Sequence, residues 1–212
     1  MTIHLTDPVT VTGAGGGIGS AALAFLRANQ PAGRVPPMIY ELHRDDALAG
    51  QDGALGLVCC HAAPIGSSLS ELLEVDVVLT RRAIDARVRG MQSAGRGSIV
   101  LFSSIRAQAP RAGQADYATT KSAIEGMTRG LAVDLAPAGI TVNAIAPGAV
   151  DTPRTRDNIR LGVVKEADLV GPLGRMATAE EIARVVAWLL FAAPPSFTGQ
   201  VVTVDAGWSV AG

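Results

Sequence analysis

Short apolar runs rich in β-branched residues alternate along the chain with longer stretches whose apolar positions recur at helical spacing. The runs predict six strands and the stretches predict four helices. We expect strands at residues 8–12, 37–42, 56–60, 98–102, 140–145 and 201–204, and helices at residues 20–28, 70–91, 117–135 and 179–191. Strands that alternate with helices indicate a parallel sheet covered on both faces.

The predicted strands read as continuous apolar runs, which is typical of strands buried on both sides. The fold class is therefore α/β, a doubly wound, Rossmann-like parallel sheet of about six strands. No repeat or composition shift marks a boundary, so residues 1–212 are predicted to form a single domain. The last predicted helix opens with a capping box, in which Thr178 and Glu181 satisfy its first free amides. Ligands of such sheets bind beyond the carboxyl ends of the strands.

Composition excludes several classes of protein. The chain has 212 residues, 48% hydrophobic and 17% charged, with 18 basic and 19 acidic side chains. Its net charge of −1 draws it neither to nucleic acid nor to an anionic membrane. We find no signal peptide and no membrane-spanning run, so a cytoplasmic location is expected. Adjacent Cys59 and Cys60 would form a strained bridge and lack further metal ligands, so we interpret them as reduced core residues and predict no metal site.

A glycine-rich turn follows the first predicted strand and leads into the first helix. Glycines let the chain turn tightly, bring its amides against a pyrophosphate and present the positive end of a helix to it. The strand and helix on either side favour a dinucleotide site over a merely flexible turn. The candidate residues are Gly13, Gly15, Gly16, Gly17, Ile18 and Gly19.

A carboxylate near the end of the second strand normally accepts hydrogen bonds from the adenosine ribose. Glu41 lies 22 residues beyond Gly19 and would repel a 2′-phosphate, which favours NAD over NADP. Alternatively, Glu41 is a solvated strand end, and Arg34 and Arg44 receive a phosphate, so NADP stays open.

Tyr117 and Lys121 are spaced to share one face of a helix. The chain has two tyrosines and two lysines, so random placement gives only about 0.02 such pairs. An ammonium about 4 Å from a phenol favours the phenolate by up to ~4 kcal/mol, nearly three pKa units, which suits general acid–base catalysis. Ser104 follows the strand at residues 98–102, thirteen residues before the tyrosine.

With the glycine turn and Ser104, these residues resemble the short-chain dehydrogenase/reductase family over nearly the whole chain, as do residues 143–153 and 198–207. The resemblance implies that a hydride passes between a nicotinamide cofactor and a hydroxyl or keto substrate. It also implies that Tyr117 exchanges a proton with the substrate oxygen, Ser104 hydrogen-bonds that oxygen, and Lys121 holds the nicotinamide ribose. By the same resemblance, the nicotinamide side is contacted by Pro147, Gly148, Val150 and Thr152.

The sequence departs from the family between its second and fourth strands. Only 15 residues separate Leu42 from Val58, which indicates a missing strand. If residues 37–42 form the second strand, the outer strand is absent; if they form the third, Glu41 is not the ribose partner. The family's Asn-Asn-Ala-Gly reads here as residues 60–63, where His61 and Ala62 are candidate cofactor contacts, although His61 could instead make a structural hydrogen bond.

The proton-relay asparagine of many relatives has Asp76 as its nearest match here, and a plain polar helix position is the alternative. The resemblance places a substrate lid between Thr152 and Arg175. In it, an apolar pocket lining is expected from Leu161, Val163, Val164, Leu169 and Val170, and Arg106 is a candidate for binding an anionic substrate. The helices at residues 70–91 and 117–135 present apolar stripes that pair across a twofold axis in the family, so a homodimer or homotetramer is expected.

Two other functions stay open at this point. The shortened adenosine side motivates a nucleotide-binding regulator with weak catalysis. A lyase or dehydratase could use the same phenol without net redox change.

Overall fold

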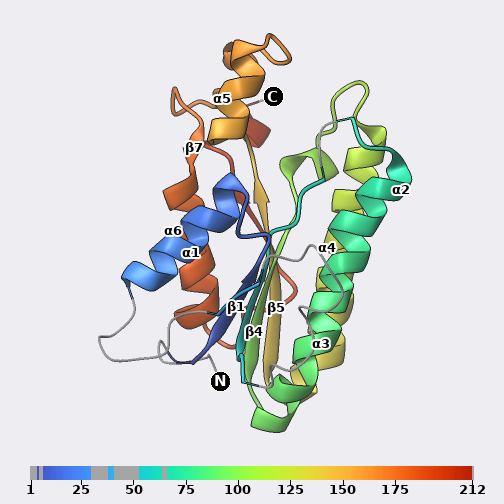
Figure 1. Ribbon diagram of the computed structural model, residues 1–212, viewed down its shortest axis with the longest axis vertical. Coiled ribbons are helices and arrows are strands. Elements are labelled where there is room, and N and C mark those ends of the chain that lie inside the picture. Colours follow the sequence, from blue (N-terminus) through green and yellow to red (C-terminus); the bar gives the residue numbers. More distant parts are fainter. Residues whose placement is uncertain (1–3, 5–6, 30–37, 41–52, 64–65, 212) are drawn as a thin grey trace.

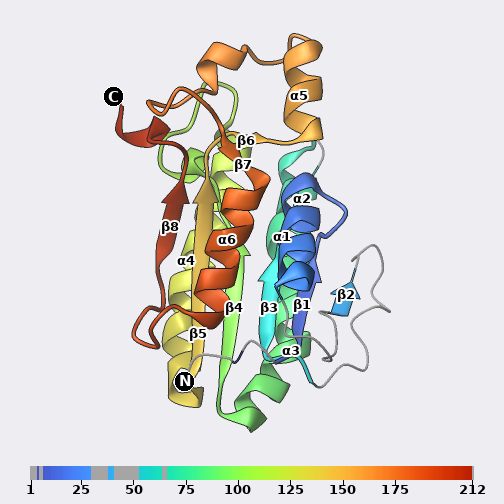
Figure 2. The same cartoon turned by 90° about the vertical axis from the view of Figure 1, so that its left-hand side faces the viewer.

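Six parallel strands form the central sheet of this computed structural model, which describes residues 4, 7–29, 38–40, 53–63 and 66–211. The order across the sheet is β2-β1-β3-β4-β5-β8 (Figure 1, Figure 2). The strands are β1 (Val9–Thr12), β2 (Met38–Tyr40), β3 (Gly56–Cys59), β4 (Gly97–Phe102), β5 (Ile140–Pro147) and β8 (Val201–Val204). All five neighbouring pairs are parallel, as the alternation of strands and helices predicts.

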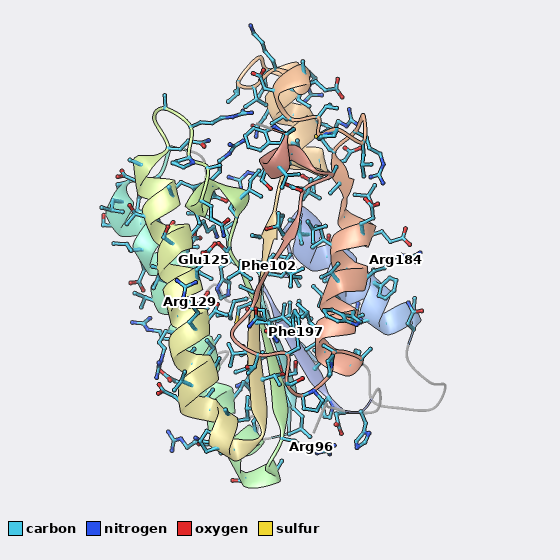
Figure 3. The ribbon with its side chains drawn as sticks, turned by 180° about the vertical axis from the view of Figure 1, so that it is seen from behind. Arg96, Phe102, Glu125, Arg129, Arg184 and Phe197 are labelled. Atoms are coloured by element: carbon cyan, nitrogen blue, oxygen red, sulfur yellow. The ribbon has the colours of Figure 1, made fainter. Side chains whose placement is uncertain are left out.

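Helices cover both faces of the sheet. One face carries α1 (Gly17–Ala28) and α6 (Ala179–Phe191), which pack on each other, and the other face carries α3 (Leu79–Ala94) and α4 (Ala115–Leu135) (Figure 1). Figure 3 shows this layering from behind, with Glu125 on α4 and Arg184 on α6 on opposite sides of the strand that carries Phe102. Every residue of β1, β3 and β4 is buried, which explains their continuous apolar runs.

The place of β2 in the sheet shows which of the family's strands lies within residues 37–42. Its Met38 is in register with Thr10 of β1, so β2 occupies the place next to β1 and corresponds to the second strand. The sheet ends at β2 on this side, within the described residues. Glu41, Arg34 and Arg44 lie outside the described residues, so the prediction that Glu41 contacts ribose stays a prediction.

The helix predicted at residues 70–91 is continuous but irregular. It begins as α2 (Leu69–Leu72), widens into the π-helical segment η2 (Leu73–Val78) and continues as α3. Such widened turns are concentrated at functional sites. The spacing of apolar residues could not predict this π-helical segment, because the wider turn adds only a single residue to the helical repeat.

Three elements at the carboxyl end of the sheet were not predicted. Strands β6 (Val150–Asp151) and β7 (Ala177–Thr178) form a short second sheet, and helix α5 (Pro153–Arg160) rises beyond it (Figure 2). The capping box of α6 is confirmed: Thr178 Oγ1 accepts from the Glu181 amide at 3.1 Å, and Glu181 Oε2 accepts from the Thr178 amide at 2.8 Å. Among the described residues, no helix combines the length and apolarity that crossing a membrane requires.

Candidate active site

The glycine turn joins β1 to α1 and lies against the end of β3. Gly13 adopts φ +72°, and a β-carbon there would lie 1.9 Å from the carbonyl oxygen of Cys60. A β-carbon on Gly19 would lie 2.2 Å from the Gly13 oxygen. Only glycine therefore permits this close approach of turn, helix and strand.

The N-terminus of α1 is open to a ligand. Gly16 is its N-cap, no side chain caps the helix, and the first turn carries no acidic residue. Gly15, Gly16 and Gly17 are exposed, while Ile18 is half-buried and packs against the core. The first amides of α1 are thus without a capping side chain, and a phosphate fits their charge and geometry.

The second half of the chain approaches the same turn. A β-carbon on Gly17 would lie 2.8 Å from Cβ of Thr152, the N-cap of α5. Pro147 ends β5, the Gly148 amide donates to the Val204 carbonyl at 3.0 Å, and Val150 is buried in β6. The structure therefore gathers these predicted cofactor residues at one end of the sheet; it does not test their roles.

Tyr117 and Lys121 lie one turn apart at the start of α4. The Lys121 ammonium is 5.5 Å from the centre of the Tyr117 ring and 3.4 Å from the Phe102 carbonyl oxygen at the end of β4. Ser104 follows β4 directly, and its Oγ accepts from the Arg106 amide at 3.2 Å in the 3₁₀ turn Ile105–Ala107, which packs on α4. The spacing argument thus predicted the pairing of Tyr117 with Lys121, and the turn that follows Ser104 packs on the same helix.

A cavity of about 460 Å³ opens beside Tyr117. It is lined by Ala62, Ala63, Gly66, Ser67, Leu72, Gly113, Gln114, Asp116, Tyr117 and Arg154. The Arg154 guanidinium crosses from α5 and donates to the Ala63 carbonyl at 3.1 Å. Sequence reasoning missed Arg154, Gln114 and Asp116, although their positions next to Thr152 and Tyr117 were a usable signal.

Asp76 contacts Lys121 directly. Its Oδ2 lies 3.0 Å from the Lys121 ammonium, and the two side chains are 0% and 4% exposed. The Ala63 amide donates to Oδ1 at 3.4 Å. Asp76 is therefore paired with a predicted catalytic residue in a buried contact, and its role in proton relay stays a prediction.

His61 is buried beyond β3 and its Nδ1 lies 2.9 Å from Thr80 Oγ1. This contact agrees with one of the two interpretations of His61, a structural hydrogen bond. Burial lowers the pKa of His61 to about 4, so the ring is neutral near pH 7. Its Nε2 is buried and has no hydrogen-bond partner among the described residues, so a cofactor contact stays a prediction.

Two expectations about the substrate side, Arg106 as an anion-binding residue and an apolar pocket lining from the lid, stay predictions, and Val164, Leu169 and Val170 are half-buried. The Arg106 guanidinium lies 4.4 Å from the Trp208 ring centre and donates to the Ala109 carbonyl at 3.0 Å, so its contacts are with the protein itself. Leu161 and Val163 are 72% and 56% exposed. Short polar turns carry them outward beyond α5.

Comparison with known proteins agrees with this arrangement. Residues 67–209 match a family profile described as enoyl-(acyl carrier protein) reductase. A solved structure described as a short chain dehydrogenase/reductase family protein superposes with a TM-score of 0.79 at 26% identity, and the match covers 100% of both chains. The chain belongs to the short-chain dehydrogenase/reductase family.

Two curated relatives are similar to this chain over part of their own length. The short-chain reductase protein NovJ of Streptomyces niveus is 44% identical over 142 residues, covering 64% of this chain and 54% of the relative. The 3-oxoacyl-[acyl-carrier-protein] reductase FabG of Pseudomonas aeruginosa is 41% identical over 128 residues, covering 59% and 51%. The chain therefore spans about half the length of these curated relatives.

Proposed function

We propose that this protein is a nicotinamide-dependent oxidoreductase that transfers a hydride between the cofactor and a secondary alcohol or ketone. The observation that carries the proposal is the position of Tyr117, which lines the cavity while the Lys121 ammonium lies 5.5 Å from its ring. A phenol beside a buried cation can release and regain a proton. The names of the two curated relatives, both reductases, support the same reaction class.

The chain's own residues manage the proton and the substrate oxygen. Tyr117 donates a proton to the carbonyl oxygen in reduction and accepts it from the alcohol in oxidation. Ser104 supplies a second hydrogen bond to that oxygen and so stabilises the charge that develops on it. The Lys121 ammonium, 5.5 Å from the ring centre, attracts the negative charge that the Tyr117 oxygen gains when it gives up its proton.

The residues at the open end of α1 suit the cofactor that this reaction needs. The amides of residues 15–19 would hold its pyrophosphate, while residues 147–152 and Lys121 would hold its nicotinamide half. The cofactor, when bound, donates or accepts the hydride. Preference for NAD rests on Glu41, and the alternative is NADP.

Titration with NADH and NADPH, followed by a screen of ketones, tests the proposal. Fluorescence transfer from Trp208, which lies near the carboxyl end of the sheet, reports cofactor binding. We expect saturable binding, tighter for NADH, and loss of the reduced-nicotinamide absorbance with at least one ketone. Binding without turnover across a broad ketone and alcohol screen would favour the nucleotide-binding regulator, and product without net absorbance change would favour a lyase.

The family resemblance also supports a homo-oligomeric state. Val133 on α4 and Val78 before α3 are exposed at 75% and 36%, on the two helices whose faces were expected to pair. Covering such side chains in a dimer or tetramer removes apolar area from water. Sedimentation at micromolar concentration tests this, and a monomer would contradict it.

A further inference from the structure

We infer that Asp76 is a positioning residue whose carboxylate holds the Lys121 ammonium and cancels part of the positive field that reaches Tyr117. The inference deepens the proposed function and rests on it for its catalytic meaning. It gives this enzyme a built-in counter-ion where the family pattern has a neutral asparagine.

The contact is buried and fixed from both sides. Asp76 Oδ2 lies 3.0 Å from the Lys121 ammonium, and Oδ1 accepts from the Ala63 amide at 3.4 Å. Lys121 is further held by the Phe102 carbonyl oxygen at 3.4 Å. Because neither side chain exceeds 4% exposure, solvent and salt screen the pair weakly. The carboxylate of Asp76 therefore lies directly against the ammonium that serves the phenol.

The other ionisable groups around this pair do not replace Asp76. Burial lowers the pKa of His61 to about 4 and raises the pKa of Cys60 to about 12, so both are neutral near pH 7. Glu125 faces Ser103, whose Oγ donates to Oε1 at 3.1 Å, and its Oε2 lies 3.8 Å from Arg129. Asp116 of α4 and Arg154 of α5 line the cavity beside Tyr117, and Arg106 of η3 (Ile105–Ala107) and Arg111 lie near it.

The size of the effect follows from the two distances. Since the ammonium lies 3.0 Å from the carboxylate and 5.5 Å from the ring centre, and the phenol oxygen lies beyond that centre, the carboxylate is at most about 11 Å from the oxygen. At an effective dielectric near 20, removing one charge at that separation shifts a protonation midpoint by about 1 pH unit, and by more if the two groups are closer. Neutralising Asp76 should move ionisation of Tyr117 to lower pH by roughly that amount.

The chain offers a direct readout of this ionisation. Tyr40 and Tyr117 are its only tyrosines, so in a Tyr40→Phe background the near-ultraviolet tyrosinate absorbance reports Tyr117 alone. We would titrate this protein and its Asp76→Asn derivative without cofactor or substrate. Asp85→Asn is the matched control, because Asp85 pairs with Arg81 at 2.8 Å on the exposed face of α3.

The account predicts that Asp76→Asn lowers the tyrosinate midpoint, and the acid limb of the kcat/KM profile, by about one unit or more. It predicts that Asp85→Asn and the charge-conserving Asp76→Glu leave the midpoint in place. An Asp76→Asn midpoint equal to that of the parent would overturn the inference, as would an Asp76→Glu midpoint that falls by a unit. If Asp76→Asn does not fold, Asp76→Ser removes the same charge and must lower the midpoint by the same amount, and an unmoved Asp76→Ser midpoint would overturn the inference.

The titration needs no turnover. A protein that oxidises no reduced nicotinamide but shows the shifted midpoint would refute the proposed function and leave the electrostatic inference standing. Normal turnover with an unmoved midpoint and pH profile would refute the electrostatic inference and leave the proposed function standing.

Discussion

Replacing Gly13 by alanine tests the packing that holds the cofactor turn against the sheet. Gly13 combines two demands: φ is +72°, and an added β-carbon would lie 1.9 Å from the Cys60 carbonyl oxygen. That oxygen belongs to backbone directly after β3, so it cannot rotate away as a side chain would. The turn or the strand end must therefore shift.

The two demands have separate costs. An L-residue in the left-handed region costs about 1–2 kcal/mol, and forcing an extra methyl into packed surroundings costs about 1–3 kcal/mol. Gly13→Ala should thus lose about 2–5 kcal/mol of unfolding free energy, which lowers Tm by roughly 10 °C for a chain of this size.

Two other glycines separate these costs. Gly95 ends α3 with φ +64° and nothing within 4 Å of its added β-carbon, so Gly95→Ala should lose only the conformational part, about 1–2 kcal/mol. Gly126 is exposed within α4 with open space around it, so Gly126→Ala should gain about 0.5–1 kcal/mol from helix propensity. Urea unfolding measures all three. Equal losses for Gly13→Ala and Gly95→Ala would refute the close approach of turn and strand.

Three further outcomes follow from single side chains. The pKa of His61, about 4 in the folded protein, lies below its usual 6.5, so the unfolded chain takes up the proton first and stability should fall as pH drops from 6.5 towards 4; His61→Gln should show a shallower fall in urea midpoints, and parallel curves would count against burial of a neutral ring. Thr178→Ala removes the capping oxygen from the Glu181 amide and should cost about 1 kcal/mol by thermal unfolding, whereas an unchanged Tm would contradict the capping role. Ser104→Ala should lower kcat about 10²-fold with cofactor affinity unchanged, and a rise in KM alone would assign the serine to binding instead.

The central strands could be predicted because their physical signal is strong and local. Residues 98–102 lie entirely in the fully buried strand β4, and residues 56–59 of the run 56–60 form the fully buried strand β3. The point where a strand ends is harder to predict. Strand β5 continues to Pro147 because its backbone pairs with β8, and the apolar run in the sequence does not show that pairing.

The substrate side resisted prediction for a different reason. Helix α5 contains no buried residue, so it has no apolar face whose period could announce it. The stacking of Arg106 on Trp208 joins residues about a hundred positions apart, which spacing along the chain cannot reveal. Only the second feature is a tertiary contact; the start of α5 has a local signal, a Thr152 N-cap followed by Pro153.

The catalytic neighbourhood was partly predictable. Tyr117 and Lys121 share a helix, so their spacing alone predicted that they lie together. Asp76 comes from another helix, and its contact with Lys121 depends on the π-helical segment that carries it. Sequence matching identified the position of Asp76 but gave no sign of an ion pair with the lysine.

The measurement that tests the central claim most directly is the single-turnover rate of hydride transfer in Tyr117→Phe, with cofactor affinity measured in parallel. Phenylalanine keeps the ring and removes only the hydroxyl that exchanges the proton. The account predicts a loss of about 10²–10⁴-fold in rate while the cofactor dissociation constant stays within a few-fold of the parent value. A Tyr117→Phe variant that transfers hydride at the parent rate would contradict it.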